Sequence, residues 1–236
     1  MRSRKSVAAV APTGARAPTT TLTELRTAAR ECKACDLWKT ATQTVFGAGP
    51  TKATIMFVGE QPGDQEDRAG LPFVGPAGKL LRDALNEAGI DSSKAYFTNV
   101  VKHFKWTAGE RGKRRIHEKP RSLEIRACRP WLDAELRAIQ PRIVVLLDAT
   151  AAQSLLGREF SVTRKRGRLV KSPVAPYVIA TVHPSSILRA PDNDSRRQQM
   201  QDFIHDLRAV AELAKATKLP RSSESARGRR PNKRCP

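Results

Sequence analysis

Four short apolar runs alternate with longer segments of helical periodicity along this chain, and the alternation limits the folds it can adopt. The runs cover residues 54–58, 95–101, 143–147 and 178–182. Each has the length and composition of a strand that is buried on both faces. Strands that alternate with helices build a mostly parallel sheet with helices on both sides. We therefore expect an α/β fold: a three-layer α/β/α sandwich around a mostly parallel four-stranded sheet, with residues 168–170 as a minor edge strand.

Caps and apolar spacing mark the helices between these runs. Thr21 and Glu24 have capping-box spacing and start a short helix that leads to a pair of cysteines. Pro76 occupies the first turn of the next helix, and Gly89 ends it. The expected helices after the first cover residues 76–88, 122–140, 150–156 and 194–214.

The length of 236 residues suits one buried domain, which we assign to residues 21–214. Residues 1–20 and 215–236 lack the apolar clusters that offset the entropy of ordering, so we expect disordered basic arms. No apolar run has the roughly 18–20 residues that span a bilayer, and residues 1–20 lack the apolar core of a signal peptide. We expect a soluble, cytoplasmic protein.

The net charge of +20 is concentrated in the two arms and in one internal segment. Residues 102–126 contain nine Lys or Arg against three Glu. A segment this basic faces an anionic partner, and phosphate is the usual one. The charge favours nucleic acid as the partner, although basic tails without any sequence-specific role are also common.

Two of the four cysteines form the pair Cys32 and Cys35, separated by two residues. In a reducing compartment this spacing favours a metal or redox site over a disulfide. Such a pair with two distant ligands fits either zinc or an iron–sulfur cluster by spacing alone. The residues by themselves leave that choice open.

Polar side chains follow three of the predicted strands, in loops that open α/β sheets place at one edge. Glu60 and Gln61 follow the first run, Asn99 ends the second, and His183 follows the last. With Phe73 as a flat apolar surface, this set suits a planar, hydrogen-bonding ligand such as a nucleobase. Each residue alone has a plainer explanation: Asn99 as a turn residue, Phe73 as a core aromatic and His183 as a satisfied loop histidine.

Five short motifs occur in order along the chain: Gly-Glu-Gln-Pro-Gly at 59–63, Leu-Pro-Phe-Val-Gly at 71–75, Thr-Asn-Val-Val-Lys at 98–102, Lys-Arg-Arg-Ile-His at 113–117 and His-Pro-Ser-Ser at 183–186. In these motifs the chain resembles the uracil-DNA glycosylase superfamily, in particular its iron–sulfur branch. The motif at 113–117 is similar to the hallmark of one subgroup, the UdgX proteins. The resemblance covers roughly residues 24–214 and implies excision of uracil from DNA.

The resemblance also implies a [4Fe–4S] cluster as cofactor. Members of the branch hold it with four cysteines, the third of which follows the Asn-Val-Val-Lys motif. This chain has His103 at that position. The implied ligands are Cys32, Cys35, His103 and Cys128. An alternative set uses Cys235 as the fourth ligand, although a cysteine in an Arg- and Pro-rich arm is poorly anchored.

The resemblance assigns roles to the residues at the predicted sheet edge. Asn99 would recognise uracil, Phe73 would stack on it, and His183 would stabilise the base oxygen that gains charge as the glycosidic bond breaks. Glu60 and Gln61 would position water or stabilise the sugar cation. The remaining substrate-binding candidates are Asp64, Ser185 and Arg115, the last through phosphate or backbone contacts.

His117 separates the functional hypotheses. In UdgX-like relatives the corresponding histidine attacks C1′ of the deoxyribose after uracil leaves, which links the protein covalently to DNA. That step requires a neutral imidazole with one nitrogen free, and a carboxylate such as Glu60 that accepts from the other nitrogen would favour this tautomer and its cationic product. If His117 only contacts phosphate, the protein is an ordinary turnover glycosylase that uses water. A third hypothesis is a non-catalytic iron–sulfur protein that binds DNA through its basic segments.

Uracil-containing single-stranded DNA is the expected partner, because extruding a base from a duplex costs a few kcal/mol. We expect a monomer that associates with the nucleoid when bound to DNA. The chain departs from the family at Asp148, where relatives are expected to have Gly. This departure puts the turn from the third strand to its helix in doubt.

Overall fold

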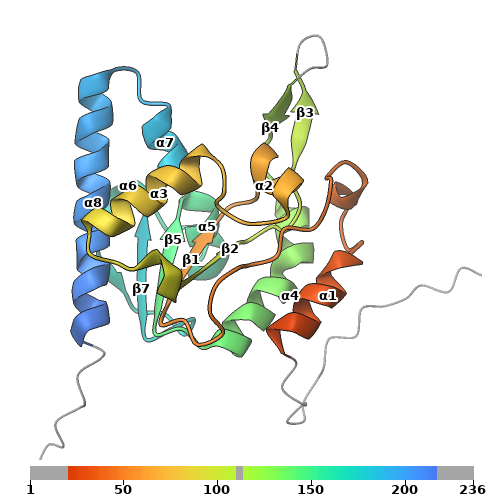
Figure 1. The fold of residues 1–236 in the computed structure, drawn as a ribbon, viewed down its shortest axis with the longest axis horizontal. Coiled ribbons are helices and arrows are strands. Elements are labelled where there is room, and N and C mark those ends of the chain that lie inside the picture. The colour runs from red at the N-terminus through yellow and green to blue at the C-terminus, as the bar shows by residue number, and fades with distance from the viewer. Residues whose placement is uncertain (1–20, 110–113, 217–236) are drawn as a thin grey trace, which may run out of the picture.

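The computed structural model describes residues 21–109 and 114–216. At its centre lies a five-stranded sheet with the order β2-β1-β5-β7-β6 (Figure 1). Its strands are β1 (Ile55–Gly59), β2 (Ala95–Asn99), β5 (Ile143–Leu147), β6 (Leu169–Val170) and β7 (Tyr177–Thr181). Neighbours among β1, β2, β5 and β7 pair in parallel, whereas β6 pairs antiparallel with β7. The predicted mostly parallel sheet of four strands with a minor edge strand is confirmed.

Helices surround this sheet. They are α1 (Leu22–Arg30), α2 (Asp64–Ala69), α3 (Pro76–Glu87), α4 (Ser122–Ile139), α5 (Ala149–Leu156), α6 (Val162–Lys165), α7 (Pro184–Leu188) and α8 (Asn193–Ala216), with short 3-10 turns at Asp36–Lys39 and Ser92–Lys94. The expected helices are present, with ends that differ by at most two residues. The sequence pattern does not predict α2, α6 and α7, because each is too short to show an apolar period.

Alternate residues of the central strands face opposite layers, as the pleat of a strand requires. On β1, Met56 and Val58 belong to a core shared with α1, α4 and α5. Ile55 and Phe57 belong to a second core, shared with α3 and α8. Figure 1 shows α3 and α8 on one side of the sheet and α1 and α4 on the other. The predicted α/β/α sandwich is confirmed.

The predicted caps hold α1 and α3 in place. Thr21 N donates to Glu24 Oε2 at 2.7 Å, and Glu24 N donates to Thr21 Oγ1 at 3.2 Å. Pro76 is the first residue of α3. Gly89 follows that helix with φ +76°, a left-handed conformation that favours glycine. Local sequence signals therefore fix these helix ends.

A two-stranded antiparallel hairpin, β3 (Trp106–Ala108) and β4 (Arg115–His117), projects beyond the edge of the sheet (Figure 1). Trp106 and His117 are register partners in it. The sequence predicts only a basic loop here, because strands of three residues leave no clear alternation. Lys113 of the basic motif lies outside the described residues.

The expectations for the basic arms concern residues outside the described part of the chain, except that residues 215 and 216 complete α8. Cys235, the alternative cluster ligand, also lies outside it. Among the helices of the described ranges, none is long and apolar enough to cross a membrane.

Candidate active site

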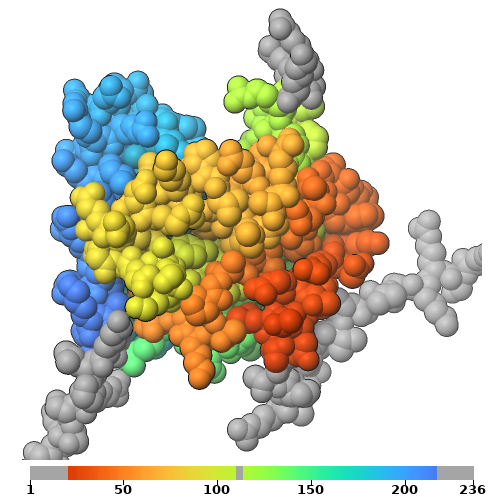
Figure 2. Space-filling view, in the orientation of Figure 1, coloured from red at the N-terminus to blue at the C-terminus, as the bar shows by residue number. Residues whose placement is uncertain are grey.

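Gly59, the last residue of β1, marks the point where three predicted site residues meet. A Cβ atom added to Gly59 would lie 2.6 Å from Asn99 Oδ1, 2.9 Å from Phe73 Cζ and 3.6 Å from His183 Nε2. A side chain here would fill the space that these groups share. The structure thus brings Asn99, Phe73 and His183 together at the carboxyl edge of the sheet. Figure 2 shows the surface hollowed between the blue segment around α7 and the yellow-green hairpin.

Phe73 has a left-handed backbone, with φ +57°, which is a genuine outlier for a bulky residue. Arg82 Nη1 donates to its carbonyl oxygen at 2.7 Å and holds the turn. The buried ring packs on Phe97 and on His183, with centroid distances of 5.9 and 6.2 Å. Backbone strain of this kind costs on the order of 1–3 kcal/mol and is concentrated at ligand sites. Phe73 is therefore a core aromatic whose Cζ also reaches the shared space.

Asn99 ends β2, and its buried Oδ1 has no hydrogen-bond partner among the described residues. The main-chain carbonyl oxygen of Asn99, by contrast, accepts a hydrogen bond from Lys102 Nζ at 2.7 Å. The same ammonium group pairs with Glu135 Oε2 at 2.5 Å, and both side chains are buried. A buried oxygen without a donor costs about 1–3 kcal/mol. Asn99 is thus held rigidly with an acceptor available for a ligand N–H group.

His183 caps α7, and this contact fixes the position of its proton. Ser185 N donates to His183 Nδ1 at 3.1 Å, and Ser185 Oγ lies 2.8 Å from the same nitrogen. Burial lowers the pKa of His183 to about 4, with smaller contributions from Arg189 and His117. The ring is therefore neutral at pH 7. Because Nδ1 accepts, the proton lies on Nε2, the nitrogen nearest Gly59.

His117 ends β4, and its ring is half exposed. His117 Nε2 lies 2.8 Å from Gln61 Nε2 and 3.5 Å from Glu60 Oε1. The main chain orients Gln61: its Oε1 accepts from Lys105 N at 3.1 Å, and its Nε2 donates to Glu118 O at 3.0 Å. Gln61 Nε2 also lies 3.2 Å from Lys105 O, so its two hydrogens serve three acceptors. The contact with His117 is the shortest of the three, and on this basis we assign the acceptor role to His117 Nε2 and the ring proton to Nδ1.

Electrostatics keep His117 in this neutral form. Burial lowers the pKa of His117, the charge of Glu60 opposes this change, and Arg189 reinforces it. Glu60 faces the same ring nitrogen as Gln61, so the expectation that it accepts from the nitrogen opposite the nucleophilic one is wrong. Thr150 Oγ1 donates a short hydrogen bond to Glu60 Oε2 and orients the carboxylate.

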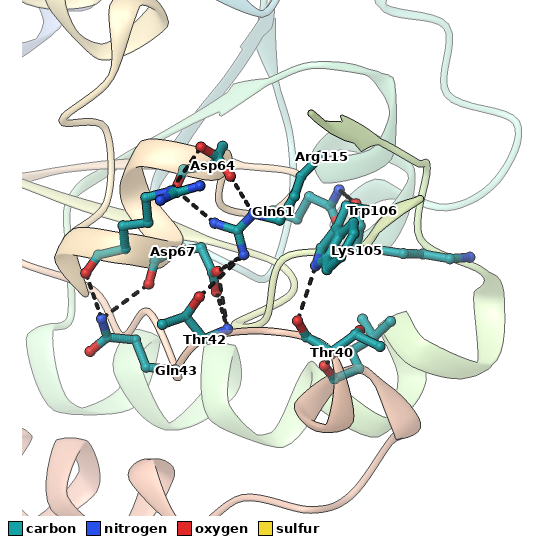
Figure 3. A network of polar contacts seen from close by, with 11 residues as sticks. Thr40, Thr42, Gln43, Gln61, Asp64, Asp67, Lys105, Trp106 and Arg115 are labelled. Atoms are coloured by element: carbon teal, nitrogen blue, oxygen red, sulfur yellow. Dashed lines mark hydrogen bonds and ion pairs between the residues drawn. The ribbon is translucent and has the colours of Figure 1, made fainter. Parts of the chain in front are cut away.

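Arg115 on β4 is enclosed by protein groups (Figure 3). Its guanidinium pairs with Asp64 and, at 2.6 Å, with Asp67. It also lies over the rings of Phe104 and Trp106, at 5.3 and 5.4 Å. Only 14% of the side chain is exposed. These contacts tie the hairpin to α2, so a direct contact of Asp64 or Arg115 with a substrate stays a prediction.

Three cysteines lie near one another where the chain leaving α1 meets α4. Cys32 Sγ accepts from Trp131 Nε1 at 3.1 Å, and Cys128 Sγ accepts from Lys102 N at 3.2 Å. Burial raises the pKa of Cys128 to about 12, and Cys32 and Cys35 add to the rise. A thiol in such surroundings becomes a thiolate only beside a cation or a metal. Hydrogen bonds to the sulfurs suit thiolate ligands.

His103, the predicted fourth ligand, is buried, and its Nε2 lies 2.9 Å from Thr44 Oγ1. Burial lowers the pKa of His103, and Asp67 partly opposes this change. Within residues 21–109 and 114–216, no three His, Cys, Asp or Glu side chains are arranged as a metal-binding group. The thiols fit a metal–thiolate group by their chemistry, whereas ligation by His103 stays a prediction.

Sequence reasoning misses the charged partners of these residues. Lys102 lies within a recognised motif, but Glu135 is 33 residues away in the chain. One signal could have revealed it: Glu135 lies on the apolar stripe of α4 with Leu132 and Ile139. A carboxylate on such a stripe requires a buried partner. Asp67 gives no comparable signal, because α2 has no apolar period.

Comparison with known proteins places the chain among its relatives. The family model described as the Uracil DNA glycosylase superfamily matches residues 46–208. The Type-4 uracil-DNA glycosylase of Thermotoga maritima is 37% identical over 175 residues, which cover 74% of this chain and 86% of that protein. Proteins of the same name from Sulfurisphaera tokodaii and Archaeoglobus fulgidus are 38% and 35% identical, over 78% and 77% of this chain and 80% and 87% of their own lengths. This chain belongs to the uracil-DNA glycosylase superfamily.

Proposed function

We propose that this protein excises uracil from DNA and that His117 then captures the deoxyribose. The observation that carries the proposal is the convergence of Asn99, Phe73 and His183 on the space at Gly59, while Glu60, the next residue in the chain, lies 3.5 Å from His117 Nε2. The name shared by the relatives, Type-4 uracil-DNA glycosylase, supports uracil in DNA as the substrate.

The polar groups around Gly59 complement uracil. The unpaired Oδ1 of Asn99 can accept the N3–H of the base. His183 Nε2 carries a proton and can donate to a carbonyl oxygen of the base, while Phe73 offers its ring. As the bond from C1′ to N1 breaks, its electron pair passes to uracil, and the donor stabilises the resulting charge. One such donor is worth about 10²–10³ in kcat.

Departure of uracil leaves a cationic centre at C1′. His117 Nε2, the ring nitrogen without the proton, gives up its hydrogen bond from Gln61 and donates its lone pair to C1′, which forms a C–N bond and passes the positive charge to the imidazole. Glu60, 3.5 Å from Nε2, stabilises this cation until the ring proton passes to solvent. Gln61 fixes the ring before the attack. The product is a covalent bond between protein and DNA.

The contacts of Gln61 also help to decide between capture by His117 and the rival hypothesis, an ordinary glycosylase that activates water. Its amide already contacts Lys105, Glu118 and His117, and Thr150 occupies one oxygen of Glu60. The Gln61 amide therefore has little hydrogen-bonding capacity left to guide water, which favours capture by His117, whereas Glu60 Oε1 still has free lone pairs that could accept from a water molecule. The relatives are named as uracil-DNA glycosylases, which is also the activity that the rival hypothesis predicts, and the adduct assay distinguishes the two.

A [4Fe–4S] cluster held by Cys32, Cys35, His103 and Cys128 belongs to the proposal. The cysteines are buried or half-buried, and two of their sulfurs accept N–H hydrogen bonds. When bound, the cluster would supply a rigid cross-link between the chain after α1, the segment after β2 and α4. Single-stranded DNA as the preferred partner, a monomeric state and association with the nucleoid are further parts of the proposal.

An adduct assay tests the function directly. Mixed with a uracil-containing single-stranded oligonucleotide, the protein should give a species that survives boiling in detergent, near one DNA per protein. The same oligonucleotide with thymine should give none. His117→Ser should abolish the adduct and release uracil slowly with turnover, because water then reaches the sugar cation. His205→Ser, an exposed histidine of α8, is the matched control.

Each rival predicts a different result. An adduct that persists in His117→Ser and maps to another residue would exclude His117 as the nucleophile. Multiple turnover without any adduct in the unaltered protein would identify an ordinary glycosylase. Binding without bond cleavage would leave a non-catalytic DNA-binding protein.

A further inference from the structure

Asp148, between β5 and α5, has a backbone conformation that is nearly restricted to glycine. Its φ is +134° and its ψ is 173°. A residue with a side chain pays on the order of 1–3 kcal/mol for this conformation. The turn between β5 and α5, which the sequence puts in doubt, therefore forms with aspartate, in a strained backbone conformation. A carboxyl group kept at such a position points to a role for its side chain.

The surroundings of this carboxyl group favour its neutral form. Two backbone hydrogen bonds oppose this preference: Oδ1 accepts from Ala151 N at 2.6 Å, which caps α5, and Thr150 N also donates to the group, and both bonds lower the pKa of Asp148. Although Asp148 is partly exposed as a residue, its Oδ2 is enclosed and has no hydrogen-bond partner in the described ranges. Burial is the largest effect and, with the charge of Glu60, raises the pKa of Asp148 well above its ordinary value, because it outweighs the hydrogen bonds from Ala151 and Thr150 and the charge of Lys119. Enclosing a carboxylate with an unpaired oxygen is costly.

Thr150 joins Asp148 to the active site. Its backbone N donates to Asp148, and its hydroxyl donates to Glu60 Oε2. The other oxygen of Glu60 lies 3.5 Å from His117 Nε2. Two carboxyl groups therefore bind one threonine, and one of them faces the histidine. Two carboxyl groups that share hydrogen bonds with one threonine resist ionising together.

We propose that Asp148 is a proton-carrying carboxylic acid and that it forms, with Glu60, a pair with a single negative charge, located on Glu60 beside His117. Asp148 is then a positioning residue that limits the negative charge near the ring. One charge is enough to stabilise the imidazolium formed by capture. A second charge would favour protonation of His117 before the attack and remove the nucleophile. This consequence rests on the proposed role of His117.

NMR titration of the His117 ring in DNA-free protein tests the charge state. Glu60→Gln should lower the pKa of His117, because it removes the charge that raises it. Asp148→Asn replaces a neutral acid by a neutral amide of similar shape and should leave the pKa of His117 unchanged. Exposed Asp194→Asn on α8 is the matched control. A fall of the pKa in Asp148→Asn comparable to that in Glu60→Gln would mean an ionised Asp148 and would overturn the proposal.

Difference infrared spectroscopy detects the proton itself. At pH 7 the unaltered protein should show a protonated-carboxyl C=O band that Asp148→Asn lacks, and Glu60→Gln should lower the pH at which this band disappears. No such band at pH 7 would also overturn the proposal. Asp148→Gly relieves the backbone strain, so it provides a second folded variant without the band. Neither method uses DNA, so failure of capture and failure of this proposal are separable.

Discussion

At the scale of single residues, Asn99 and His183 present one acceptor and one donor to the same space. Uracil offers an N–H flanked by carbonyl oxygens, whereas cytosine has an unprotonated ring nitrogen at that position. An acceptor on Asn99 would face the lone pair of cytosine and repel it. Sites built to hydrogen-bond one partner reject an analogue that lacks it by about 10⁴–10⁵. In the proposed reaction, the fixed polarity of these two side chains would account for the selection of uracil over cytosine.

The depressed pKa of His183 predicts a specific loss of stability in acid. An unfolded histidine titrates near its ordinary value of 6.5, whereas in the folded protein the pKa is about 4. Between these pH values the unfolded state binds more protons, so the free energy of unfolding falls as pH falls from 6.5 to 4, by about 1.4 kcal/mol per unit of difference. Denaturant titrations at pH 7 and 4.5 should show a larger loss for the unaltered protein than for His183→Asn. An equal loss of unfolding free energy in the unaltered protein and in His183→Asn would contradict this explanation.

At the scale of elements, the hairpin and α2 form one assembly that presents His117. Arg115 and His117 alternate on β4, so they lie on one face of the hairpin. The pairs of Arg115 with Asp64 and Asp67 fix that face against α2. The pKa of Asp64 shows the effect of this contact. Burial raises that pKa, but the hydrogen bonds from Arg115 and Arg68 outweigh burial, so the net pKa is lowered. The basic residue thus serves internal positioning.

Loss of this anchor should uncouple capture from base excision. In Arg115→Met the aliphatic stem still packs on the rings. Buried Asp67 loses its cationic partner and keeps only the hydrogen bond from Thr42 N, and breaking a buried pair costs about 3–5 kcal/mol. The rate of adduct formation should fall at least tenfold, while uracil release persists. Arg114→Met, an exposed neighbour, should behave like the unaltered protein. Equal losses of adduct and of uracil release in Arg115→Met would mean general unfolding.

The elements also show what a sequence can predict. Strands buried on both faces and helices with an apolar stripe carry their structure in local pattern, so the sheet and α3, α4 and α8 are foreseen. The hairpin and α2 depend on contacts across the chain: Arg115 lies 48 residues from Asp67, and His117 lies 56 from Gln61. Motifs identify Asn99, Phe73 and His183, but no local pattern reveals how Arg115 or Asp148 is used.

At the scale of the whole molecule, the three cysteines join segments that are distant in the chain. Anaerobically purified protein should contain iron and labile sulfide. Cys128→Ala should lose both, and His103→Ala should make the cluster far more sensitive to oxygen. Cys235→Ala is the matched control and should retain the cluster. Stoichiometric zinc without sulfide would exclude the iron–sulfur assignment, and a fragile cluster in Cys235→Ala would move the fourth ligand from His103 to Cys235.

The net charge of +20 predicts that DNA binding by the whole molecule depends strongly on salt. Residues 1–20 contain four Lys or Arg, and residues 217–236 contain seven. Each phosphate contact made by these residues releases counterions and steepens the salt dependence by about 0.7 per contact on single strands. A chain of residues 21–216 keeps all of α8 and every described site residue. It should bind any DNA more weakly, with a flatter slope of log affinity against log salt, while its adduct yield at saturating DNA stays unchanged. As a control, the salt dependence is also measured with the thymine oligonucleotide. A non-specific electrostatic effect of the arms must change the slope equally for the uracil and the thymine oligonucleotides. An unchanged slope would mean that the arms do not contact DNA and that the charges of the domain carry the binding.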